Sequence, residues 1–180
     1  MRQIGILFYF KAIFIIITII IVLFSCNSCL LKADRYEATI LDYAIKYNVD
    51  PCLISAVCQV ESAFDPTAES SAGAIGLMQI LPSTGAWLAG VLGLEYNDAL
   101  LYEPAYNIRI GTYYLAYLYT RFREDWMVYA AYNAGENRVS EWLKEGIDRG
   151  TIPFPETKSY VLKIERARKR FQRKKSATFY

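Results

Sequence analysis

Histidine is missing from this chain of 180 residues. Its absence excludes Ser-His and Cys-His catalytic pairs, and it excludes metal sites that depend on imidazole. Cysteine is scarce: there are four, and Cys52 and Cys58 lie six positions apart in a region with helical periodicity. Two side chains at that spacing point about 120° apart around a helix axis, so they should not form a disulfide with each other. The sequence therefore predicts no disulfide framework, no bound metal and no cofactor.

Long stretches of alternating apolar and polar residues are absent too, as are internal repeats and low-complexity tracts. The periodicity is helical instead, and prolines mark several helix starts, because proline is well tolerated in the first helical turn. The sequence predicts a mainly α domain with at most a small β ribbon near residues 74–80. The predicted helices cover residues 34–47, 51–63, 82–92, 104–122, 126–132, 136–144 and 156–172.

A long apolar run lies near the start of the sequence. From Ile4 to Cys26 the residues are almost all Ile, Leu, Val and Phe, and Lys11 is the only charged one. A bilayer span takes about 20 apolar residues, so this run predicts one transmembrane helix. Basic residues at its start favour a cytoplasmic N-terminus. We expect a membrane anchor or signal segment at residues 1–31, and an extracytoplasmic domain at residues 32–180 of a single-pass membrane protein.

The end of this run leaves other possibilities open. Residues Leu23 to Cys26 resemble the cleavage box of bacterial lipoproteins, in which Cys26 would carry the lipid, although the bulky Phe24 fits that box poorly. No Ala-x-Ala cleavage pattern of a signal peptide follows. An uncleaved anchor is favoured, and a lipoprotein or a secreted protein are the alternatives.

Basic residues gather late in the sequence. The net charge is +2, yet residues 163–175 hold eight basic residues and one acidic residue. Arg166, Lys169, Arg170 and Arg173 fall near one face at helical spacing. This tail either tethers the protein to anionic wall polymers or is a solvated helix end that the helix dipole favours. Nucleic acid is not an expected partner, because base stacking requires interleaved aromatic residues that the tail lacks.

One carboxylate continues an apolar helix face. Ile54, Val57, Cys58 and Glu61 share a face at the spacing i, i+3, i+4 and i+7. A carboxyl group placed there is partly desolvated, and desolvation favours its protonated form, which a general acid needs. The alternative is that Glu61 sits at a helix end and reaches water. The small residues that follow it indicate a surface where another molecule approaches the backbone closely.

Four blocks of the sequence, taken together and in this order, allow a comparison with a known protein family. They read "ESAFDPTAESSAGAIGLMQILPST", "AYNIRIGTYYLAYL", "AAYNAGENRVSEWL" and "PFPETKSYVLKI". This pattern resembles the lytic transglycosylases related to the catalytic domain of the soluble bacterial enzyme. The resemblance implies a lysozyme-like α-helical domain, similar to goose-type lysozyme, that acts on peptidoglycan glycan strands.

The resemblance also implies roles for individual residues. Glu61 matches the catalytic acid and base, and Tyr160 matches a tyrosine whose hydroxyl group reaches it. The residues implied to bind substrate are Ser62, Ser70, Met78, Gln79, Tyr132, Asn133 and Tyr160. Several of these have plainer interpretations without the family. Ser70 is also typical of a turn, Met78 and Tyr132 of a core, and Asn133 of a helix end.

The implied reaction needs one carboxylate rather than the two of ordinary glycosidases. Glu61 would protonate the oxygen of the β-1,4 bond between N-acetylmuramic acid and N-acetylglucosamine. It would then take the proton from the C6 hydroxyl of the muramoyl sugar, which attacks C1 and gives a 1,6-anhydro end. A lysozyme-type hydrolase that uses Glu61 with water, and a wall-binding protein without turnover, remain as alternatives.

Overall fold

The computed structural model describes residues 17–18 and 33–178. The chain divides into two compact units, Met1–Arg35 and Tyr36–Tyr180. In the first unit the described residues are helical. The predicted span Ile4 to Cys26 lies outside the described residues, apart from Ile17 and Thr18. Within residues 17–18 and 33–178, no helix is both long and apolar enough to cross a bilayer.

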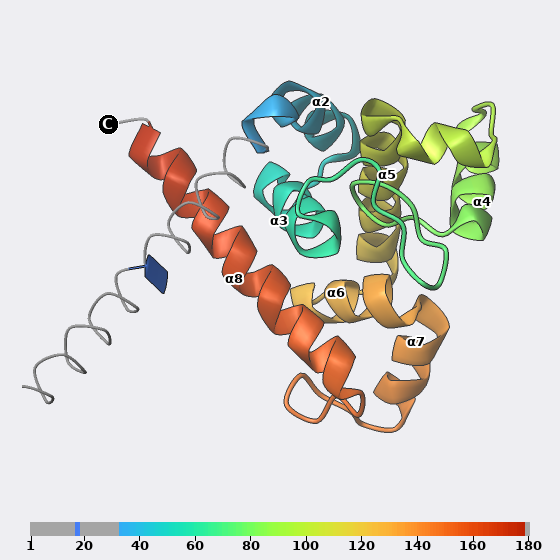
Figure 1. Ribbon diagram of the computed structural model, residues 1–180. Coiled ribbons are helices and arrows are strands. Elements are labelled where there is room, and N and C mark those ends of the chain that lie inside the picture. The colour runs from blue at the N-terminus through green and yellow to red at the C-terminus, as the bar shows by residue number, and fades with distance from the viewer. Residues whose placement is uncertain (1–16, 19–32, 179–180) are drawn as a thin grey trace, which may run out of the picture. The chain divides into compact units, whose positions relative to one another are not determined.

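The second unit is helical throughout, as the sequence predicts (Figure 1). The ribbon expected near residues 74–80 is reduced to two isolated bridges, between Glu69 and Ile75 and between Ile75 and Ile80. Its elements are α2 (Glu37–Tyr47), α3 (Pro51–Ser62), α4 (Pro82–Leu92), the 3-10 helix η1 (Asp98–Tyr102), α5 (Pro104–Arg121), α6 (Asp125–Ala134), α7 (Glu136–Lys144) and α8 (Pro155–Thr178).

Local sequence determines where α3 begins and ends. The side chain of Asp50 accepts a hydrogen bond from the backbone N of Cys52 at 2.8 Å, and proline occupies the first turn, so the exposed backbone groups of that turn are satisfied. At the other end Ala63 and Phe64 both adopt left-handed backbone angles, with φ of 51° and 62°. The N–H of Phe64 bonds back to the carbonyl oxygen of Cys58, which closes the helix sharply. The chain therefore turns away directly after the last turn of α3.

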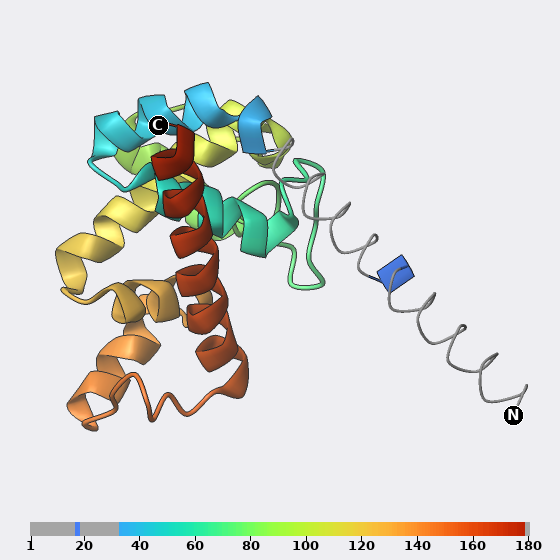
Figure 2. The same cartoon turned by 90° about the vertical axis from the view of Figure 1, so that its left-hand side faces the viewer.

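Helix α8 holds the unit together by packing against α3 and α6 (Figure 2). Phe171 of α8 meets the buried ring of Phe64 edge to face, with centroids 6.3 Å apart. Arg168 of α8 donates to Asp50 Oδ2 at 2.7 Å and to the Tyr129 hydroxyl at 2.8 Å. These contacts fix α8 against the helix that carries Glu61.

Candidate active site

Glu61 lies in the last turn of α3. Ile54, Val57 and Cys58 on its face are buried, and Glu61 itself is only partly exposed. Burial raises the pKa of Glu61 to about 7, and the hydrogen bond from Tyr160 opposes that rise. A carboxyl group with this pKa is protonated in a large fraction of molecules near neutrality, which is the state that a general acid requires.

Tyr160 comes from α8 and contacts Glu61 directly. Its hydroxyl group donates to Glu61 Oε1 at 2.6 Å, and its side chain is buried. Burial, followed by the negative charge of Glu61, raises the pKa of the Tyr160 phenol well above its usual value. The phenol therefore keeps its proton and remains a donor to the carboxylate. The structure brings together the two residues that the resemblance paired.

Two further side chains hold the loop that faces this pair. The Ser62 hydroxyl donates to the carbonyl oxygen of Leu77 at 2.8 Å, and the Tyr132 hydroxyl donates to that of Met78 at 2.8 Å. Burial and then the charge of Glu61 raise the pKa of Tyr132 well above its usual value, so Tyr132 lies within electrostatic reach of the acid. Ser62 and Tyr132 thus fix the loop backbone beside Glu61.

Asn107 is the residue that the sequence analysis missed. It is fully buried in α5. Its Oδ1 accepts from the backbone N of Met78 at 2.8 Å, and its Nδ2 donates to the carbonyl oxygens of Ile75 at 2.9 Å and Leu101 at 2.7 Å. The available signal was a polar residue on an otherwise apolar helix stripe that continues four positions later with Gly111.

The small residues of the loop have a packing role inside the protein. Gly76 has a φ of 79°, and a Cβ there would overlap Asn107 Nδ2 and the carbonyl oxygen of Leu101, so a larger residue does not fit. Gln79 has a φ of 50°, and its Nε2 donates to the carbonyl oxygens of Ala68 and Gly76, each at 3.0 Å. The loop is therefore fixed before any ligand arrives.

Ser70, Met78 and Asn133, the remaining expected site residues, have three different environments. The Ser70 Oγ accepts from the backbone N of Ala74 at 3.0 Å and closes a turn. Met78 is fully buried, so in this conformation its side chain has no surface to offer a ligand. Asn133 is exposed, and its Oδ1 accepts from the Thr157 hydroxyl at 2.8 Å, which joins the end of α6 to the start of α8.

The nearest acids in the sequence are engaged elsewhere. Asp65 Oδ1 accepts from the backbone N of Thr67 at 2.9 Å, and Glu69 Oε2 accepts from the Tyr102 hydroxyl at 2.9 Å. Within the described part of the chain, no second carboxylate contributes to the raised pKa of Glu61. The arrangement therefore provides one buried acid and a phenol donor, without a carboxylate partner.

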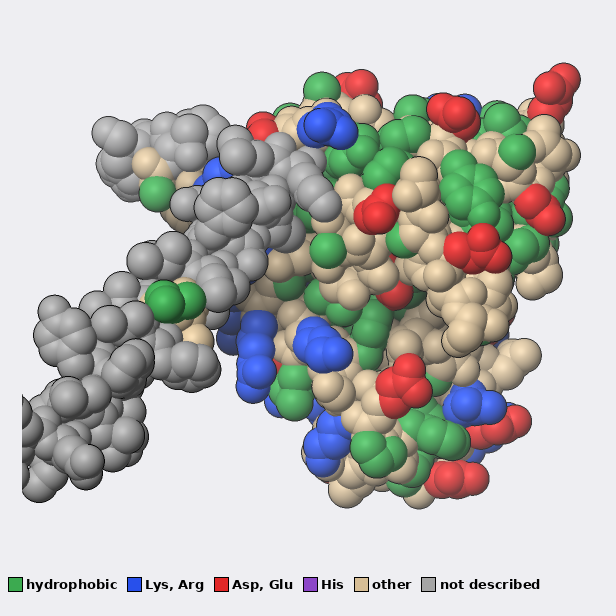
Figure 3. Space-filling model, viewed as in Figure 1, with side chains coloured by type: hydrophobic (Ala, Val, Ile, Leu, Met, Phe, Trp, Pro, Cys, Tyr) green, Lys and Arg blue, Asp and Glu red, His purple; other side chains and the backbone are tan. Residues whose placement is uncertain are grey.

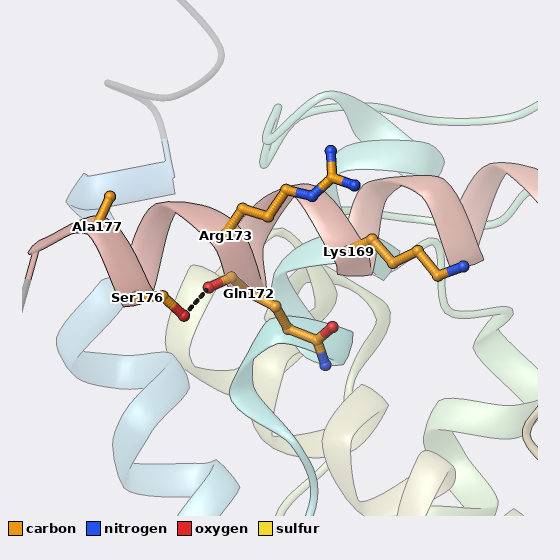
Figure 4. Close-up of a pocket in the computed structure, with 5 residues that line it drawn as sticks. All are labelled: Lys169, Gln172, Arg173, Ser176 and Ala177. Carbon is orange, nitrogen blue, oxygen red and sulfur yellow. Dashed lines mark hydrogen bonds between the residues drawn. The ribbon is translucent and has the colours of Figure 1, made fainter.

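Two hollows lie away from Glu61. One, of about 440 Å³, is bounded by Tyr114 of α5 and by the start of α7. The other, of about 480 Å³, is lined by residues of α8 (Figure 4), and Lys169 and Arg173 extend from the helix there. The first adjoins the candidate site because the ring of Tyr114 lies 5.2 Å from that of Tyr132, centroid to centroid.

This chain is similar in sequence to curated lytic murein transglycosylases. The soluble lytic murein transglycosylase of Salmonella typhimurium is 40% identical over 145 residues, which cover 73% of this chain and 22% of that protein. The membrane-bound lytic murein transglycosylase C of Actinobacillus pleuropneumoniae is 30% identical over 169 residues, covering 78% of this chain and 46% of that protein. The chain thus spans less than half the length of these relatives.

Solved structures extend the likeness to the fold. An inactive mutant of the lytic transglycosylase Slt from Pseudomonas aeruginosa superposes with a TM-score of 0.73 at 33% identity, over 78% of this chain and 24% of that one. A soluble lytic transglycosylase in complex with bulgecin A gives a TM-score of 0.72. The expected mainly helical, lysozyme-like fold is confirmed. The sequence model described as Transglycosylase SLT domain matches residues 38–154, and the chain belongs to that family.

Proposed function

We propose that this chain cleaves the glycan strands of peptidoglycan as a lytic transglycosylase, with Glu61 as its single acid and base. The observation that carries the proposal is the placement of Glu61: its carboxyl group continues a buried helix face and accepts a hydrogen bond from the buried Tyr160 at 2.6 Å, and burial raises its pKa to about 7. A carboxyl group with this pKa can donate a proton and take one back near neutral pH. The names of the relatives, which are lytic murein transglycosylases, support the substrate class.

The reaction follows from one carboxyl group acting twice. Protonated Glu61 gives its proton to the glycosidic oxygen while the C1–O bond breaks, and the N-acetyl group of the muramoyl sugar supports the positive charge at C1. The carboxylate then accepts the proton of the C6 hydroxyl, whose oxygen bonds to C1 and closes the 1,6-anhydro ring. The hydrogen bond from Tyr160 stabilises the carboxylate between the two steps.

Ser70, Gln79 and Asn133 are proposed to lie along the bound strand, and the buried side chain of Met78 to support the loop backbone against which the strand lies. Gln79 and Ser70 would act mainly by holding the loop backbone in shape, because their polar atoms bond to it. Asn133 has an exposed side chain, so its amide nitrogen can reach a sugar. Preformed groups of this kind lower the entropy cost of binding.

Muropeptide mass spectrometry tests the proposal. Purified peptidoglycan is incubated with the wild-type protein or with Glu61→Gln, which keeps the shape of the side chain but cannot donate the proton. We expect 1,6-anhydromuramoyl ends from the wild type and no release from the variant. Reducing muramoyl ends alone would identify a lysozyme-type hydrolase, and no release from either would favour a wall-binding protein.

We also propose that residues 1–31 anchor the domain outside the cell membrane. The apolar run from Ile4 to Cys26 and the basic Arg2 and Lys11 support a single span with the N-terminus inside. Protease added to intact protoplasts should then degrade the domain. If the domain is protected from the protease, its orientation is the reverse of the one proposed. If the single change Cys26→Ala releases the domain from the membrane, Cys26 carries a lipid anchor.

A weaker tether to anionic wall polymers is proposed for the tail. Lys and Arg side chains gather over α8 (Figure 3), where Arg166, Lys169 and Arg173 are exposed. Arg170, which the spacing predicts near the same face, is only partly exposed, and its guanidinium group lies 5.7 Å from the ring centroid of Phe171. Arg168 is engaged in ion pairs, so fewer charges are available than the sequence count implies.

Sedimentation with purified walls tests the tether. A Glu61→Gln protein without its anchor should sediment with walls at low salt and less as salt rises, because exposed charges are screened within about 10 Å at 0.1 M. Replacing Arg166, Lys169 and Arg173 by glutamine should remove the salt-dependent part. If that variant sediments with walls as the parent protein does, the tether is excluded and the basic residues of α8 are only a solvated helix surface.

A further inference from the structure

Four aromatic side chains form a row that leads away from Glu61. Tyr132 of α6 lies beside the acid, and the ring centroid of Tyr114 is 5.2 Å from that of Tyr132. Trp87 of α4 comes next, with centroid distances of 6.4 Å to Tyr114 and 5.1 Å to Tyr117. In Figure 1, α4 lies beside α5, and α6 begins at the far end of α5. The row therefore extends across three helices.

The rings of this row are held in fixed orientations. Tyr114 and Tyr117 stack with 13° between their planes, and Trp87 stands at 83° and 84° to them. The Tyr117 hydroxyl donates to Glu136 at 3.0 Å, and Glu136 is paired with Arg121 at 3.5 Å. An aromatic surface that is already ordered loses little conformational entropy when a ligand covers it.

Trp87 presents a large apolar surface to solvent at the outer end of this row, with 44% of its side chain exposed. An exposed tryptophan has not gained the stability that its burial would provide. Val91, one turn further along α4, is an aliphatic residue exposed to 55%. An isolated exposed aliphatic residue is common, whereas an ordered aromatic surface that continues from a candidate active site suits ligand binding.

The neighbouring side chains suit a sugar. The hollow of about 440 Å³ is lined by Tyr114, which contacts Trp87, and by polar residues that include Asn137, Arg138 and Glu141. A pyranose ring has an apolar C–H face and a rim of hydroxyl groups, so it can stack on an aromatic ring while hydrogen-bonding amide and charged groups. A flat apolar ligand would leave these polar groups unsatisfied.

We propose that Trp87, with Tyr114, is a sugar-stacking subsite remote from the scissile bond that makes cleavage favour long glycan strands. The inference rests on the proposed function, because it takes the substrate to be a β-1,4-linked strand of N-acetylated hexosamines that passes Glu61. Binding energy gained at a remote subsite can lower the barrier at the reacting bond. A strand that ends before it reaches Trp87 gains nothing from that ring.

The kinetic test compares substrates of different length. Glycan strands freed of peptides are separated into tetrasaccharides and long strands, and kcat/KM is measured for the wild type and Trp87→Ala. We expect a loss of about tenfold on long strands, the size of one aromatic contact, and less than a twofold change on the tetrasaccharide. Trp87→Phe should restore most of the loss, and Val91→Ala should match the wild type at both lengths.

Binding separates this inference from the proposed function. In a Glu61→Gln background, calorimetry with the same strands should show weaker binding of long strands, but not of the tetrasaccharide, when Trp87 is replaced by Ala. An equal loss at both lengths, or none at either, would overturn the inference. If the wild type cleaves no strand, the proposed function fails, while the binding comparison still decides the role of Trp87.

Discussion

Replacing Tyr160 by Phe removes one hydroxyl group that contacts the carboxyl group of Glu61, the proposed acid. That hydroxyl donates to Glu61 Oε1 at 2.6 Å. Because it bonds to the charged form, it holds the pKa of Glu61 below the value that burial alone would give. A hydrogen bond to a charged group contributes about 1.5–3 kcal/mol, and 1.36 kcal/mol corresponds to a pKa change of about 1. Tyr160→Phe should therefore raise the pKa of Glu61 by about 1 to 2.

The pH profile of kcat/KM measures this change. Glu61 must be protonated in the free enzyme, so activity falls as pH rises through its pKa of about 7. In Tyr160→Phe the alkaline limb should move to higher pH, and the maximum should fall because the carboxyl loses its orientation. Tyr119→Phe is the matched control, since its hydroxyl donates to Asp125 at 2.7 Å and does not contact Glu61. An alkaline limb that stays in place, or moves to lower pH, would refute the reasoning.

Two further predictions concern stability. The pKa of Glu61 rises on folding from 4.5 to about 7, so its contribution to stability is complete below pH 4.5 and is lost as pH rises through 7. In urea unfolding, Glu61→Gln should therefore gain about 3 kcal/mol of stability relative to the wild type between pH 4.5 and 8, and a difference that stays constant with pH would argue against a desolvated acid. Asn107→Ala should cost about 3 kcal/mol, because it removes three buried hydrogen bonds and takes from the N–H of Met78 and the carbonyl oxygen of Leu101 their side-chain partner, while Ile75 keeps its bond from Ile80. Asn97→Ala, which removes one exposed cap bond at 3.2 Å, should cost less than about 1 kcal/mol.

Much of the fold could be predicted because local signals mark the helices. Pro51, Pro82 and Pro104 stand at the first positions of α3, α4 and α5, as predicted. Helix α8 continues to Thr178, beyond the predicted end at residue 172. The repulsion among the basic residues of this helix is offset by tertiary contacts, such as the ion pairs of Arg168. The 3-10 helix η1 was missed, since five residues carry too little periodicity to detect.

The site was predictable only in part. The apolar stripe before Glu61 was enough to predict a partly buried carboxyl group, because it depends on one helix. The hydrogen bonds of Ser62, Gln79 and Tyr132 to loop carbonyl groups join segments far apart in sequence. Those contacts depend on how the helices pack, which no local pattern encodes. For the same reason the central position of Asn107 could not be predicted.

If Glu61 breaks the glycosidic bond without water, no oxygen from the solvent enters the product, and digestion in heavy-oxygen water measures this. Peptidoglycan is digested in that solvent, and the masses of the released muropeptides are measured by mass spectrometry. Attack by the C6 hydroxyl takes its oxygen from the sugar, so we expect anhydro ends with no heavy oxygen, and no products at all from Glu61→Gln. Muramoyl ends that carry one heavy oxygen from the solvent would contradict the account.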